Sequence, residues 1–210
     1  MSQKQNVMQS KNDFKLPKQI IGSAHDTESF KKIEEAITIS SQYEILKDRF
    51  FDINHWMEYC GSLSAEFKLC NSSGIIINSK PKLKDFIRIK IPGPGLREGN
   101  NYDWVQIIRI EEGIHNLSDY CLFECSPCKM PGAKHYFGVA HFYTSKATST
   151  FIISKENDCL KVSVHGRNET PNYKVSALSK FRNFMIAVGG MFGFSKIEWK
   201  RLTDGLLDFK

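Results

Sequence analysis

The chain has 210 residues, of which 41% are hydrophobic and 12% aromatic, which is enough apolar material to fill one sizeable core. Its formal net charge of +6 comes from 29 Lys and Arg residues against 23 Asp and Glu residues, spread along the chain rather than gathered in one basic stripe. This spread argues against a nucleic-acid partner, and the lack of a run of ~18 apolar residues argues against a membrane-spanning helix.

The N-terminal segment is polar and Lys-rich, and it has no apolar core of the kind that secretory signals contain. We therefore expect a cytoplasmic protein in which the six Cys residues are reduced thiols. Residues 1–27 show no periodic apolar pattern and are predicted to form a mobile tail. Residues 28–210 are predicted to form a single α+β domain.

The first folded elements are predicted between residues 31 and 61. Residues 31–39 end in an alternation of Ile, Thr and Ile that predicts a strand, with a helix as the nearest alternative. Ser41 and Glu44 have the spacing of a capping box, which predicts that a short helix begins at Ser41. Asn54 is expected to cap a second short helix that ends at Gly61.

From residue 64 onwards apolar residues recur at every second position, which predicts a series of antiparallel strands joined by turns rich in Gly, Asn and Pro. The predicted strands cover residues 64–70, 85–92, 103–111, 119–125, 147–154 and 159–165, with a further strand around 139–144. Residues 126–139 contain two Pro and two Gly, and they are predicted to form a long loop over one mouth of the sheet.

After Pro171 the apolar spacing returns to that of a helix. Gly189-Gly190 is predicted to interrupt this helical segment. Ser195 and Glu198 have the spacing of a second capping box, which predicts a separate final helix beginning at Ser195. The C-terminal segment is therefore expected in two helical pieces.

This order of elements resembles the START-like helix-grip fold, also called the polyketide-cyclase or SRPBCC superfamily. The resemblance covers residues 31–209 and rests on the helix start at Ser41, the Phe51-Asp52-Ile53-Asn54-His55-Trp56 passage and the amphipathic C-terminus. It implies a curved antiparallel sheet of about six to eight strands, with two short N-terminal helices and a C-terminal helical segment packed on it. In that superfamily the sheet and helix enclose an apolar cavity, which holds lipids, hormones or aromatic polyketides in different members and supports catalysis in some.

The resemblance implies that the protein binds a small hydrophobic molecule in a cavity between the sheet and the C-terminal helix. The candidate ligand-binding residues are Trp104, Arg109, Phe123, His141 and Arg167. Arg109 has the same strand parity as Val105 and Ile107, so it is expected to point inward as an anchor for an anionic group. If that face points outward instead, Arg109 is a solvated side chain.

Two other functions remain open. An enzyme on the same scaffold would use His141 or a carboxylate for acid–base catalysis, and a protein-interaction module would use an aromatic patch around Tyr136 and Phe137. A homodimer is compatible with either. No cofactor is expected, because the sequence contains neither a P-loop nor a dinucleotide-binding Gly pattern.

Cys121, Cys125 and Cys128 form the sharpest local motif, with His135 and His141 downstream. Thiolates at this spacing can bind zinc or an iron–sulfur cluster. The spacing also resembles the cluster motif of radical-SAM enzymes, whose large strand–helix repeat this chain lacks. The alternation of polar and apolar residues makes Cys121 and Cys125 ordinary inward residues of a strand, so no metal is expected.

Overall fold

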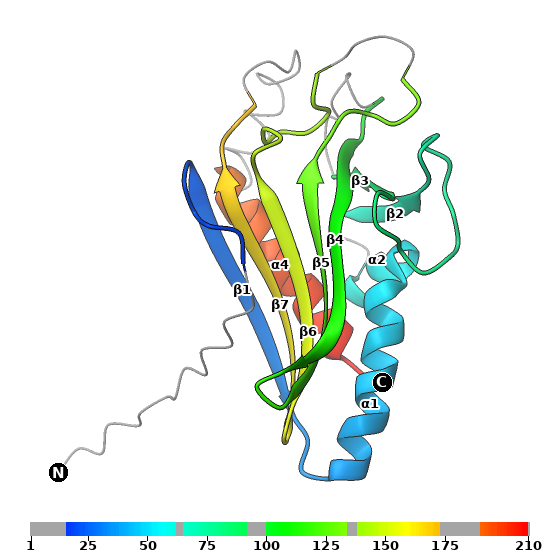
Figure 1. Ribbon diagram of the computed structural model, residues 1–210, viewed down its shortest axis with the longest axis vertical. Coiled ribbons are helices and arrows are strands. Elements are labelled where there is room, and N and C mark those ends of the chain that lie inside the picture. Colours follow the sequence, from blue (N-terminus) through cyan, green and yellow to red (C-terminus); the bar gives the residue numbers. More distant parts are fainter. Residues whose placement is uncertain (1–15, 62–64, 92–99, 134–137, 173–189, 210) are drawn as a thin grey trace, which may run out of the picture.

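The computed structural model describes residues 16–61, 65–91, 100–133, 138–172 and 190–209 (Figure 1). The elements in chain order are β1 (Ser23–Lys32), α1 (Ala36–Phe51), the 3-10 helix η1 (Ile53–His55), α2 (Trp56–Cys60), β2 (Glu66–Cys70), β3 (Phe86–Lys90), β4 (Asp103–His115), β5 (Ser118–Pro127), β6 (Thr148–Glu156), β7 (Cys159–Glu169) and α4 (Gly190–Leu207). None of the helices in these ranges is both long and apolar enough to cross a membrane.

The described strands form one seven-stranded sheet in the order β1-β7-β6-β5-β4-β3-β2, and each pairs antiparallel with its neighbour. The sheet curves around α4, which lies behind β6 and β7 in Figure 1, while α1 and α2 flank the β4 side. We call the face that contacts these helices the inner face. The predicted α+β class and the predicted helix-grip arrangement, a curved antiparallel sheet packed around a C-terminal helix, are confirmed.

The first strand lies earlier in the chain than expected. β1 begins at Ser23 and pairs with β7, so the prediction of a strand over residues 31–39 is wrong and residues 23–27 do not belong to a tail. The reason is that the buried side chains of β1 are polar and gave no apolar alternation. The Ser29 hydroxyl, for example, lies 2.7 Å from the Thr203 hydroxyl of α4.

The first helix is longer than predicted and begins at Ala36. Its buried face is formed by Ile39, Tyr43, Leu46 and Phe50. This spacing of three to four residues is helical and prevails over the short alternation that predicted a strand. Ser41 therefore lies inside the helix, where its hydroxyl donates a hydrogen bond to the Thr38 carbonyl at 2.9 Å, and the predicted capping box is wrong.

Asn54 does not cap α2. Its side-chain amide instead donates to the Ile77 carbonyl at 2.8 Å and accepts from the Leu69 amide at 2.8 Å, which fastens the passage between the helices to the edge of the sheet. The second short helix does end before Gly61, as predicted, and this residue has a φ of 89° that favours glycine.

The six predicted strands from residue 64 onwards correspond to β2–β7, because the apolar residues of their inner face recur at every second position. Residues 139–144 are not a strand. Among them, Tyr143 forms an isolated bridge with Pro171, and the segment crosses the end of the sheet instead of extending it.

The final helix α4 runs without interruption from Gly190 to Leu207, so the predicted start at Ser195 is wrong. Glu198 does not cap a helix. Its carboxylate accepts a hydrogen bond of 2.6 Å from the Ala65 amide, which ties α4 to the start of β2. The predicted interruption at Gly189 lies outside the described residues.

An aromatic cluster fills most of the space between the inner face and the helices. The indole of Trp56 is fully buried, and its centroid lies 5.3 Å from that of Phe67, 5.9 Å from Phe123 and 5.5 Å from Phe151. Trp199 of α4 contacts the Phe67 and Phe151 rings from the other side, with centroid distances of 6.0 and 5.4 Å. These rings join three strands and two helices through apolar contacts.

Gly205 permits the close packing of α4 on α2. A Cβ atom at this position would lie 3.1 Å from Cys60 Cα and closer still to the Tyr59 carbonyl, and this backbone cannot move aside. Although alanine favours helices by ~1 kcal/mol over glycine, we expect Gly205→Ala to lower the free energy of unfolding by ~1–3 kcal/mol. Urea denaturation measures the change, with Ile197→Ala on the exposed side of α4 as the control. A more stable Gly205→Ala protein would show that the two helices are not in close contact.

Candidate functional site

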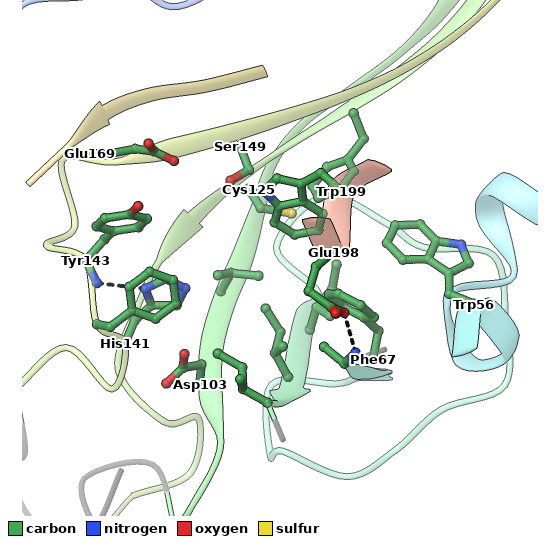
Figure 2. Close-up of a pocket in the computed structure, with 17 residues that line it drawn as sticks. Trp56, Phe67, Asp103, Cys125, His141, Tyr143, Ser149, Glu169, Glu198 and Trp199 are labelled. Carbon is green, nitrogen blue, oxygen red and sulfur yellow. Dashed lines mark hydrogen bonds between the residues drawn. The ribbon is translucent and has the colours of Figure 1, made fainter. Parts of the chain in front are cut away.

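A pocket of about 60 Å³ remains at one end of the inner face, between the sheet, α4 and the segment 138–147 (Figure 2). Its apolar wall includes residues of six elements, namely Trp56, Phe67, Ile89, Val105, Phe151 and Trp199. By the same kind of measure one water molecule needs ~10–15 Å³. The pocket therefore has room for a compact molecule or for the end of a longer one.

Asp103 places a carboxyl group in this apolar wall. It is the first residue of β4, and its side chain is only 4% exposed. Within the described part of the chain its Oδ2 atom has no hydrogen-bond partner. Burial without a compensating charge raises the pKa of Asp103 well above its usual value, so the group favours the uncharged acid.

His141 lines the same pocket and is held in one orientation. The Tyr143 amide donates a hydrogen bond to His141 Nδ1 at 3.0 Å, which assigns the proton of the neutral ring to Nε2. Burial lowers the pKa of His141 to about 3, so the ring is neutral at physiological pH. The Asn172 side chain donates to the His141 carbonyl at 3.1 Å and fixes the segment from outside.

Glu169 contributes a second buried carboxyl group, which Figure 2 shows at the opposite end of the pocket from Asp103. Its Oε1 atom lies 2.9 Å from His25 Nδ1, whereas Oε2 is buried without a partner in the described residues. Gly166 makes this arrangement possible, because a side chain there would overlap both His25 and Glu169.

Glu198 is a third carboxyl group at the pocket, but it already has partners. The Ala65 amide donates to Oε2 at 2.6 Å, and Arg201 lies 3.2 Å from Oε1. Burial raises the pKa of Glu198, while these two partners oppose the shift. This residue therefore acts mainly as a structural tie between α4 and the segment before β2.

Of the five residues proposed from the sequence, His141 alone is among the described residues that line the pocket. Phe123 lies deeper in the core, stacked between Trp56 and Phe151. Trp104 is buried on the outer face of the sheet in a small cluster with Cys70 and Ala140. Tyr136 and Phe137, the proposed interaction patch, lie outside the described residues.

Arg109 does not point inward, because a bulge interrupts β4. Ile107 faces Cys125 and Arg109 faces Glu124 across the ladder, so Ile108 is an extra residue that reverses the alternation. The guanidinium Nε donates to Glu111 at 2.7 Å on the outer face. Arg109 is therefore held by Glu111 and by the buried Glu124, and it does not serve as an anchor inside the pocket.

Arg167 is also on the outer face. Its guanidinium lies 2.8 Å from the Asp26 carboxylate and donates to the Gly166 carbonyl at 2.7 Å. The ion pair with Asp26 connects β1 to β7, and the described residues that line the pocket include no arginine.

The three cysteines of the sequence motif do not converge. Cys121 and Cys125 both face inward on β5, and four strand residues separate such positions by ~13 Å. Cys128 packs instead against the outer cluster around Trp104. Burial raises the pKa of Cys121 to about 11 and that of Cys128 to about 12, which disfavours the thiolates that a metal needs. Among the described residues no group of three His, Cys, Asp or Glu side chains could hold a metal ion.

Sequence reasoning missed Asp103 and Glu169. A signal for Asp103 was present, because it has the same parity as the inward residues Val105 and Ile107 before the bulge. Glu169 carried no such signal, since its approach to His25 depends on the pairing of β1 with β7.

No protein-family model matches the chain, and no curated protein matches it. Solved structures of similar fold include the hypothetical protein jhp0584 from Helicobacter pylori, with 12% identity, coverage of 89% of this chain and 87% of that chain, and a TM-score of 0.50. At this identity the likeness concerns the fold alone. Ginseng major latex-like protein 151 from Panax ginseng has 10% identity, coverage of 89% and 97%, and a TM-score of 0.35. Ara h 8.0201 has 11% identity, coverage of 86% and 99%, and a TM-score of 0.34.

The raised pKa of Asp103 predicts a specific pH dependence of stability. The folded protein retains the Asp103 proton at pH values where the unfolded chain, with a pKa near 3.8, has lost it. The free energy of unfolding should therefore fall as pH rises above 3.8 toward the folded pKa, by up to ~1.4 kcal/mol per pH unit.

Asp103→Asn removes this titration while keeping the shape of the side chain. The difference in unfolding free energy between the variant and the wild type should grow in favour of the variant between pH 4 and pH 7. Urea denaturation across this range measures it, because all other titrating groups cancel in the difference. Parallel curves would mean that Asp103 ionises as freely in the folded state as in the unfolded one.

Proposed function

We propose that the protein binds a compact, largely apolar molecule in the pocket between the inner face of the sheet and α4. The observation that carries this proposal is an aromatic pocket that contains a buried carboxyl group, Asp103, without a hydrogen-bond partner in the described chain. A buried polar group of this kind costs folding free energy, on the order of 1–3 kcal/mol. Such a cost is typical of sites that are completed by a ligand.

The volume of the pocket limits the size of this molecule. Pockets for drug-sized ligands usually measure ~300–1,000 Å³, and the aromatic cluster around Trp56 occupies the remaining space under the sheet. The proposal is therefore a small ring or a short chain, or the end of a longer molecule, rather than a whole lipid.

Binding can be tested with benzene, which enters apolar cavities of comparable character. Amide NMR spectra of the labelled protein should shift at residues near the pocket as benzene is added, and Trp56 and Trp199 fluorescence should change because both rings line the pocket. Native mass spectrometry after mild purification would detect any molecule that co-purifies.

A cavity-filling variant makes the test specific. Ser149 lines the pocket, and Ser149→Leu should weaken benzene binding at least about tenfold by occupying its volume. Thr148→Leu is the matched control, since the neighbouring residue of β6 points to the opposite face. If benzene binds both variants and the wild type equally, it does not bind in this pocket.

A further inference from the structure

We propose that the pocket recognises an uncharged hydrogen-bond acceptor, such as a ketone or aldehyde oxygen, through the carboxyl group of Asp103 and the Nε2–H group of His141. This inference rests on the proposed binding function and specifies the chemistry of the ligand.

Asp103 has the surroundings of a neutral acid. A buried carboxylate is normally stabilised by several N–H donors or by a cation. The described residues provide neither to Asp103, whose Oδ2 atom is buried without a partner. The group is therefore stable as the acid, and its O–H can donate a hydrogen bond to a ligand. Burial raises its pKa in the direction that this role requires.

His141 supplies a second donor at the same end of the pocket. Its Nδ1 already accepts from the Tyr143 amide, so the neutral ring presents N–H at Nε2. The Trp104 amide donates a hydrogen bond to the Ala140 carbonyl at 2.8 Å. Asp103 directly precedes Trp104 in the chain, and His141 directly follows Ala140. This bond brings the two residues to the same end of the pocket, where Figure 2 shows both side chains. A carbonyl oxygen there can accept from two neutral donors, as in a preorganised oxyanion site.

The charges around the pocket disfavour an anionic ligand. No Lys or Arg occurs among the described lining residues, while Glu169 and Glu198 contribute two further carboxyl groups. A carboxylate or phosphate would therefore lose its hydration without gaining a cation.

An organic ammonium is the strongest rival, because aromatic rings can bind cations through their faces. It would require Asp103 to ionise in a place where no described N–H supports the carboxylate. The desolvation of both charges then opposes the ion pair. A neutral acceptor avoids this cost, so we favour it over the ammonium.

Three ring molecules of similar size separate these cases: cyclohexanone, methylenecyclohexane and cyclohexylamine. The first has an acceptor oxygen, the second replaces that oxygen with a CH₂ group, and the third is a cation at neutral pH. Dissociation constants are obtained from amide NMR titrations of the full chain. We expect cyclohexanone to bind about tenfold more tightly than methylenecyclohexane, and cyclohexylamine to bind most weakly.

Two substitutions assign the preference to Asp103. Asp103→Asn keeps an uncharged N–H donor and should retain the preference for cyclohexanone, whereas Asp103→Val removes the donor and should abolish it. The amide NMR spectra show whether each variant is folded. If the valine variant is unfolded, the binding of the ketone and the hydrocarbon is compared in the asparagine variant alone.

The outcomes distinguish this inference from the proposed function. Equal binding of the ketone and the hydrocarbon would overturn the inference while leaving the pocket as a binding site. Tightest binding of cyclohexylamine, lost in Asp103→Asn, would show a cation site and also overturn it. If none of the three molecules nor benzene binds, the proposed function fails, and the inference fails with it.

Discussion

The fold depends on the packing of one indole ring. Trp56 begins α2, directly after the turn that ends α1, and its ring is in contact with Phe67, Phe123 and Phe151 of β2, β5 and β6. The indole N–H donates to the Arg49 carbonyl at 3.1 Å, so the ring is fixed both by hydrogen bonding and by apolar contact. Because this cluster occupies the middle of the inner face, the pocket that the described residues leave under the sheet lies toward one end of it.

That end of the sheet gathers three buried ionisable groups around the pocket. Asp103, His141 and Glu169 lie on three different segments and are all buried next to apolar side chains. A core that contains such groups is less stable than a fully apolar core of the same shape. The proposed binding of a ligand in the pocket would account for their common location, while the aromatic cluster contributes the apolar contacts that offset their cost.

The sequence predicted the strands well because their inner-face residues are apolar and recur with a period of two residues, even where the middle of β5, β6 and β7 is buried on both faces. It failed where tertiary contacts replaced that pattern. The polar residue Ser29 is buried because α4 supplies the Thr203 hydroxyl, and Arg109 points outward because Ile108 adds a bulge. In the candidate site, the position of His141 beside an apolar wall was anticipated. The pair of His25 and Glu169 was not, since residues so distant in sequence meet only through the strand order.

The pairing of the first strand with the last has a consequence for how the chain folds. Ser23 and Glu169 are 146 residues apart, yet they are joined at the edge of the sheet. During synthesis β1 has no partner until nearly the whole chain has emerged, so its backbone donors and acceptors stay open to other strands for that time. Closure of so long a loop is slow compared with the formation of the hairpins between β4 and β7. The charged and hydroxyl side chains of β1, Asp26 and Glu28 among them, are of the kind that keeps an unpaired strand from associating with other chains.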